Sequence, residues 1–199
     1  MNLPISTAVT GFHSAMLLHL KQDTPAPTRP DHPAWEAIDR NHRCNILLWD
    51  AEDQARRSDV PDSAVVSSKR SIDRHNQQRN DAIECIDECL LASLPAMLES
   101  SRLNSETAGG MIDRLSILSL KRYHMDFQAN RQDANPEHLA TCKEKLDRLT
   151  EQRDDLARCL DELLAQCAAG HARFKIYRQY KMYNDPALNP WLNRPVIAD

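Results

Sequence analysis

The stretch NPEHLATCKEKLDRLTEQRDDLARCLDELLAQCAAG, at residues 135–170, decides the fold. Its apolar residues recur at alternating intervals of three and four positions, the pattern of one buried helix face. Asn135 and Pro136 suit the cap and first turn of a helix, and Gly170 suits its end. We therefore predict a long helix over 136–169. Its heptad seam, with one charged member, comprises Leu139, Cys142, Leu146, Leu149, Arg153, Leu156, Leu160, Leu163 and Cys167.

The rest of the chain predicts four more helices around this one. A loop with four prolines lies at 22–33, and prolines or glycines mark most of the other breaks. We predict a single all-α domain over 1–199, an antiparallel bundle of about five helices, two of them long, with a C-terminal aromatic and basic strap at 174–199. The other expected helices span 6–21, 34–57, 62–94 and 110–131.

Composition agrees with one helical globular domain. The chain has 199 residues, of which 41% are hydrophobic and 27% charged, and only four are glycine. Its net charge of −4 argues against a nucleic-acid partner, which would require a basic surface.

The first residues do not suggest export, and no stretch of the sequence suggests a membrane span. The first residues, MNLPISTAVTGFHSAMLLHLK, lack the pattern of a signal peptide, and no apolar run reaches about 18 residues. We therefore expect a cytoplasmic protein without membrane insertion. Its six cysteines form no C-x-x-C pair, so reduced buried thiols are expected, with a structural zinc site as the alternative.

The predicted helix at 34–57 has two faces that both look packed. One is apolar, and the opposite one places a tryptophan and two isoleucines among polar residues, which a solvated face rarely does. We expect this second face to contact another helix, a partner subunit or a ligand. Its polar and aromatic members are His42, Asn45, Trp49, Asp53 and Arg56.

The predicted helix at 62–94 carries a polar row directly beside a narrow apolar stripe. Such a row should lie at the edge of the core and be partly desolvated, so its charges need ion-pair or hydrogen-bond partners. The row consists of Lys69, Asp73, Asn76, Asn80, Glu84 and Asp87.

Together these two helices predict a polar pocket for a small anionic ligand. Its cations would neutralise phosphate, and His42 beside Asp53 or Glu84 would move protons or orient hydroxyl groups. Two interpretations without a site stay open, namely a structural network of ion pairs and a solvated face with surface salt bridges. The pocket hypothesis adds Glu52 and Arg70 to the residues already named.

Acidic pairs on the same two helices raise the question of a metal. Asp50 and Asp53, and Glu84 and Asp87, are each three positions apart. This resembles the pattern of all-helical nucleoside triphosphate pyrophosphohydrolases, which use magnesium to activate water. That family has E-x-x-E on one helix, where this chain offers D-x-x-D. Magnesium is thus a cofactor only in this alternative, with Asp53, Glu84 and Asp87 as candidate ligands.

A second candidate site lies where the helix at 110–131 begins. Polar residues at 104–107 precede Gly109 and Gly110, and the free N–H groups of a helix start can hold an anion. A flexible loop with an ordinary helix cap is the alternative. The charged residues that follow on the helix are Asp113, Arg114 and Lys121.

Aromatic and basic residues alternate in the tail. This pattern suits stacking of a base or sugar beside a cation, or else a strap whose rings cover the bundle. The residues are Lys175, Tyr177, Arg178, Tyr180, Lys181 and Tyr183.

Four stretches resemble an uncharacterised bacterial family, domain of unknown function 4254. They are NHRCNILLWDAEDQAR at 41–56, KRSIDRHNQQRND at 69–81, NSETAGGMIDRLSILSLK at 104–121 and YRQYKMYNDPALNP at 177–190. The resemblance implies a helical fold and no activity. It also suggests a setting in surface-polysaccharide assembly, since such genes neighbour glycosyltransferases.

Three functions remain open from the sequence. The first is binding of, or action on, a small phosphorylated or sugar-nucleotide ligand in the polar pocket. The second is a non-catalytic scaffold or interaction protein, with helix 136–169 joining a partner or a second copy. The third is the magnesium-dependent pyrophosphohydrolase. The sequence leaves open whether the protein is an enzyme.

Overall fold

A computed structural model describes residues 3–96, 98–179, 182 and 185–192. Five helices make up nearly all of its regular structure, as the apolar spacing predicts, so the expected all-α bundle is confirmed. The helices are α1 (Ser6–Gln22), α2 (Ala34–Ala55), α3 (Asp62–Ser93), α4 (Ala108–Ala129) and α5 (Pro136–Ala168).

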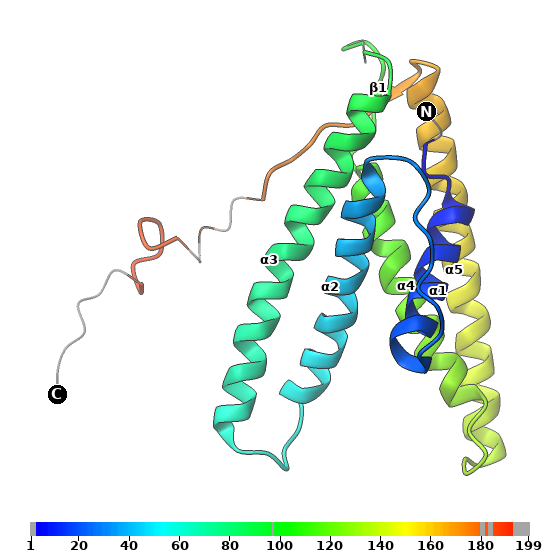
Figure 1. Ribbon diagram of the computed structural model, residues 1–199, viewed down its shortest axis with the longest axis vertical. Coiled ribbons are helices and arrows are strands. Elements are labelled where there is room, and N and C mark those ends of the chain that lie inside the picture. The colour runs from blue at the N-terminus through cyan, green and yellow to red at the C-terminus, as the bar shows by residue number, and fades with distance from the viewer. Residues whose placement is uncertain (1–2, 97, 180–181, 183–184, 193–199) are drawn as a thin grey trace.

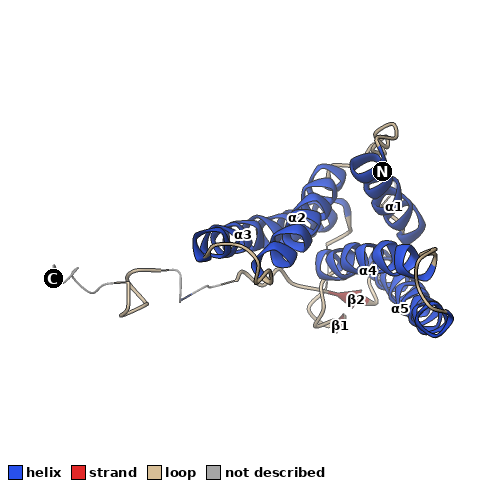
Figure 2. Cartoon of the chain, turned by 90° about the horizontal axis from the view of Figure 1, so that it is seen from below, coloured by secondary structure: helices blue, strands red, loops and turns tan. Residues whose placement is uncertain are grey.

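Two helical hairpins form the frame of the molecule (Figure 1). Helix α2 runs along α3, and α4 runs along α5, in each case as antiparallel neighbours joined by a short loop. Viewed from below, the two hairpins meet at an angle, and α1 lies against the side where they join (Figure 2). Asp161 of α5 fixes the start of α1 by accepting hydrogen bonds from the backbone N–H and the hydroxyl of Ser6.

The heptad seam of α5 is used within the chain. Leu156, Leu160, Leu163 and Cys167 are buried in the main core, and the α5 face that carries them packs mainly on α4. Their burial supplies the hydrophobic stabilisation that the spacing predicted. Arg153, the charged exception, is only partly buried.

Both ends of α5 are defined as the sequence predicts. The side chain of Asn135 accepts the N–H of His138, with Pro136 in the first turn. Gly170, just past the helix, has a φ of 75°, a left-handed conformation that favours glycine. The chain then forms the two-residue strand β2 (Ala172–Arg173), which pairs in parallel with β1 (Arg102–Leu103).

Helices α3 and α4 approach each other closely where α4 begins. A Cβ on Gly109 would lie 2.6 Å from the carbonyl oxygen of Ile83 and 2.9 Å from the carboxylate of Asp87. Glycine is therefore required where α4 starts against α3. Toward its other end α4 leans away from α3, and the space between them widens (Figure 1).

None of the helices in the described part of the chain combines the length and hydropathy needed to cross a membrane.

Candidate functional site

A buried polar network joins α2, α3 and α4 just below their close approach. Its centre is Asp113 of α4, whose carboxylate accepts two hydrogen bonds from the guanidinium of Arg79 on α3, from Nε at 2.8 Å and from Nη2 at 2.5 Å. Asn41 and Asn45 of α2 each donate to the same carboxylate at 2.9 Å. Four hydrogen bonds thus compensate the desolvation of a charge that is almost fully buried.

A buried histidine extends this network toward α1. Nε2 of His42 lies 3.0 Å from the carbonyl oxygen of His13, which can only accept, so Nε2 must donate. Burial lowers the pKa of His42 to about 4, so its ring is neutral and Nδ1 accepts from the Ser116 hydroxyl at 2.7 Å. Ser116 in turn accepts from Asn45 at 2.9 Å. The hydrogen-bond directions are therefore fixed from α1 to Asp113.

His13 itself lies against His42 with its imidazole ring stacked at 4.4 Å. The ring is fully buried, and neither of its nitrogens has a hydrogen-bond partner in the described structure. Burial, and next the neighbouring His42, lower the pKa of His13 well below its ordinary value. Both imidazoles are thus held neutral in the core.

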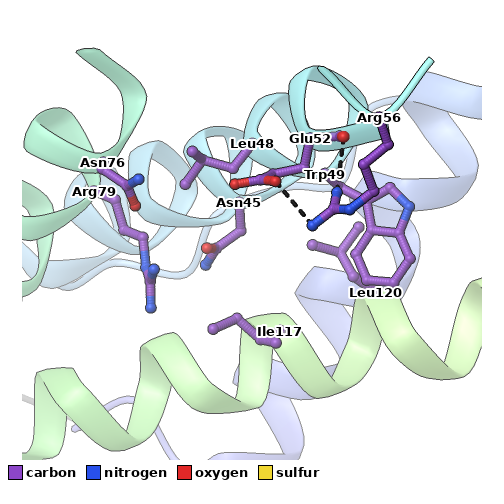
Figure 3. Close-up of a pocket in the computed structure, with 9 residues that line it drawn as sticks. All are labelled: Asn45, Leu48, Trp49, Glu52, Arg56, Asn76, Arg79, Ile117 and Leu120. Atoms are coloured by element: carbon purple, nitrogen blue, oxygen red, sulfur yellow. Dashed lines mark hydrogen bonds and ion pairs between the residues drawn. The ribbon is translucent and has the colours of Figure 1, made fainter. Parts of the chain in front are cut away.

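An open groove of about 450 Å³ lies beside the network, where α4 diverges from α3. In Figure 3, Asn76 and Arg79 extend from α3, and Ile117 and Leu120 come from α4. The α2 side of the groove is formed by Asn45, Leu48, Trp49, Glu52 and Arg56.

Several polar groups of the groove remain available to a ligand. Arg79 uses Nε and Nη2 on Asp113, and within the described residues its Nη1 has no hydrogen-bond partner. The side chain of Asn76, also partly buried, makes no hydrogen bond to any described residue. At the rim, Arg56 pairs with Glu52 at 2.9 Å and is mostly exposed. The groove therefore offers one fixed donor, from Arg79, and one unbonded amide, from Asn76, with little net charge.

Trp49 closes one end of the groove. Its ring stacks on His124 of α4 at 4.5 Å with nearly parallel planes. Burial lowers the pKa of His124, and the nearby Lys21 lowers it further. A rigid aromatic wall of this kind suits the apolar face of a sugar or a planar ring.

The structure brings together only part of the predicted pocket. Asn45, Trp49, Glu52, Arg56 and Asn76 all line the groove. His42 and Asp113 are buried behind it, and Asn80 is partly buried outside its lining. The predicted residues that point to solvent instead are Asp53, Lys69, Arg70 and Asp73.

The exposure of Lys69 and Asp73 is explained by the divergence of α4 from α3. Lys69 and Asp73 form an ion pair at 2.5 Å with side chains more than half exposed, because α4 does not reach this part of α3. Their expected place at a desolvated pocket edge is therefore wrong, and this pair matches the solvated-face alternative.

The acidic end of the polar row on α3 is occupied by other parts of the chain. Glu84 accepts from Arg178 at 2.5 Å and from the N–H of Gln179 at 3.1 Å. Asp87 accepts from the N–H of Gly109 at 2.6 Å. Burial raises the pKa of Asp87 to about 6, although its hydrogen bonds from Thr107 and Gly109 act in the opposite direction.

These contacts also bear on the predicted anion site at the start of α4. The N–H groups of Gly109 and Gly110 are already bonded, to Asp87 and to the Thr107 hydroxyl. The expectation that they are free is therefore wrong. Arg114 is paired with Glu106 at 2.7 Å, and Lys121 lies further along α4 beside a different pocket.

The candidate magnesium ligands do not converge. Asp53 points to solvent on α2, whereas Glu84 and Asp87 contact the tail and the start of α4. No group of three or more histidine, cysteine or acidic side chains among the residues described here is placed to hold a metal ion.

The tail is described only in part. Arg178 bridges Glu84 and Glu88, and Tyr177 is largely exposed. Tyr180, Lys181 and Tyr183 lie outside the described residues.

The sequence prediction missed Arg79, Asn41, Ser116 and His13. Arg79 could have been found, since it lies seven positions after Ile72 and seven before Ile86, both buried. A charged residue in an apolar register indicates a buried partner.

Comparison with known proteins assigns the family. The family described as a protein of unknown function (DUF4254) matches residues 35–176, well over half of the chain. The chain belongs to this family. The matched span contains the whole Arg79–Asp113 network on α2, α3 and α4 and every residue that lines the groove. No curated protein and no solved structure matches the chain.

Proposed function

We propose that the protein binds a small phosphorylated sugar, with or without an attached nucleotide, in the groove between α2, α3 and α4. The observation that carries this proposal is the convergence of Asn45, Asn76 and Arg79 on one open groove, with Arg79 immobilised by a buried carboxylate. The locked guanidinium of Arg79 can donate from Nη1 without reorganisation on binding, and the amide oxygen of Asn45 and the unbonded amide of Asn76 add further hydrogen-bonding groups.

The charge balance of the groove favours the sugar part of such a ligand. Arg79 is neutralised by Asp113 and Arg56 by Glu52, so the groove supplies donors and acceptors more than net positive charge. Hydroxyl groups use both kinds of partner. Trp49, Ile117 and Leu120 provide apolar surface for the face of a sugar ring.

The cellular setting that we propose comes from the family resemblance, and the groove is compatible with it. We place this binding in the cytoplasm and in the assembly of bacterial surface polysaccharide, where phosphorylated sugars are the building units. The buried histidines have no access to the groove, so the proposal is one of binding and assigns no catalytic residue.

Calorimetric titration of the purified protein with glucose 1-phosphate and UDP-glucose tests the proposal. We expect at least one of them to bind, and Asn76→Ala to weaken binding about five- to tenfold, the typical worth of one hydrogen bond to a ligand. Asn80→Ala is the matched control, since Asn80 lies one turn away on α3 and does not line the groove. No binding of either compound, or equal losses in both variants, would contradict the proposal.

A further inference from the structure

A second pocket, of about 420 Å³, adjoins the groove at Trp49. It lies between α4 and α5, and Trp49 lines both spaces. Lys121, Met125 and Gln128 recur at helical spacing on α4, and they face Lys145, Leu149 and Gln152 on α5. Two rows on antiparallel helices therefore form the walls of the pocket, with the remaining lining from His124 and Arg148.

The chemistry of this pocket differs from that of the groove. Its lining includes three cations, Lys121, Lys145 and Arg148, and no carboxylate. Within the described residues neither lysine forms an ion pair or hydrogen bond, and Arg148 has only a long contact of 3.6 Å to Glu144 on the exposed surface. In a chain with a net charge of −4, this is a local site for negative charge.

Between the cations the surface is apolar and partly aromatic. Met125, Leu149 and the stacked Trp49–His124 pair supply it. The side-chain amides of Gln128 and Gln152 lie on the same walls, and Gln152 has no partner among the described residues. The amide oxygen of Gln128 accepts from Nη1 of Arg131 at 3.3 Å. An acyl chain would offer the Gln152 amide no hydrogen bond, whereas the edge of a heteroaromatic ring can bond it.

We propose that this pocket is a nucleotide subsite, which takes the base and phosphates of a nucleoside diphosphate while the adjoining groove takes the sugar attached to it. The inference rests on the proposed function and gives it a substrate class, a nucleoside diphosphate sugar. The base lies between Met125 and Leu149, the phosphates are neutralised by Lys121 and Lys145, and Trp49 marks the boundary between the diphosphate and the attached sugar.

Calorimetric titrations with UDP and UDP-glucose test the division of the ligand. Lys121→Gln/Lys145→Gln should weaken both compounds by the same factor, about tenfold or more, because each loses its phosphate contacts. Asn76→Ala should weaken UDP-glucose and leave UDP unchanged. Lys143→Gln/Lys175→Gln removes two charges from exposed positions outside the pocket and should change neither affinity.

The outcomes separate this inference from the function on which it rests. If Asn76→Ala weakens UDP-glucose but the double lysine variant binds UDP like the wild type, the groove stands and the nucleotide subsite is refuted. Binding of dodecyl phosphate in place of UDP, with loss in the double lysine variant, would refute the nucleotide and assign the pocket to an acyl chain. If the wild type binds none of these compounds or glucose 1-phosphate, both proposals fail.

Discussion

The two halves of α3 carry similar residues and meet different surroundings. In the first half, Lys69 and Asp73 pair with each other in solvent. In the second half, Arg79 and Asp87 are drawn into contact with α4, at Asp113 and at Gly109. What differs is the neighbour, since α4 approaches α3 at Gly109 and then leans away. The groove lies between these two halves of α3, at the point where α4 begins to lean away.

This comparison teaches that helix splay, and not residue type, decides whether a polar row becomes a site. An ion pair in solvent gains little, because water screens it and holding two long side chains costs entropy. A paired charge in the core fixes a geometry, because breaking it leaves the partner uncompensated. The predictions below set the two halves against each other.

The largest effect should come from removing the buried acid. Asp113→Ala leaves Arg79 without its partner, removes the acceptor of the Asn41 amide and one acceptor of the Asn45 amide, and should cost about 3–5 kcal/mol of unfolding free energy. Asp73→Ala removes the corresponding acid of the exposed pair and should cost less than about 1 kcal/mol. Urea unfolding followed by circular dichroism measures both. Equal losses would show that the two pairs do not differ as described.

Adding one methyl group at Gly109 should test the close contact between α3 and α4. Gly109→Ala places a Cβ against the Ile83 carbonyl and should destabilise the protein by about 1–3 kcal/mol. Gly11→Ala, in the middle of α1, meets nothing within 4 Å and should stabilise by about 0.5–1 kcal/mol. Thermal unfolding should show these opposite signs, and a harmless Gly109→Ala would refute the close approach.

A smaller effect should appear as pH falls. His42 has a folded pKa of about 4 and an unfolded one near 6.5, so the unfolded state binds more protons between these values. The contribution of His42 to the free energy of unfolding is intact above pH 6.5, and by pH 5 this free energy should have fallen by about 2 kcal/mol. The measurement is the difference in unfolding free energy between wild type and His42→Gln at pH 7 and pH 5.

Asp87 should change the stability in the opposite direction as the pH falls. Its folded pKa of about 6 lies above the unfolded value, so its ionisation disfavours folding as pH rises through 6. The unfolding free energy of the wild type relative to Asp87→Asn should therefore increase when the pH falls from 7 to 5. Over the same change, the unfolding free energy of the wild type relative to His42→Gln should decrease. Two differences of the same sign would contradict the assignment of these buried groups.

The sequence predicted the helices well because their signals are local. The seam of 136–169, the four prolines of 22–33 and the cap at Asn135 each act within a few residues of where they occur. The expected boundaries of 34–57 and 110–131 differ from α2 and α4 by only two residues at an end.

The site was harder because it depends on contacts between helices. Asn45 and Asp113 were both candidates, but they were assigned to separate sites, since nothing local says that α4 packs on α2. His42 was expected to act on a ligand, and it is instead enclosed behind Ser116. Lys69 and Asp73 belong to the same predicted polar row as Asn76, but only Asn76 lines the groove.

A crystal structure of the protein grown with UDP-glucose tests the central claim most directly. The account predicts density for the sugar in the groove, with its hydroxyl groups bonded to Asn45, Asn76 and Nη1 of Arg79, and with the Arg79–Asp113 pair unchanged. Ligand density bound away from α2, α3 and α4, or a groove closed by movement of α4 onto α3, would contradict it.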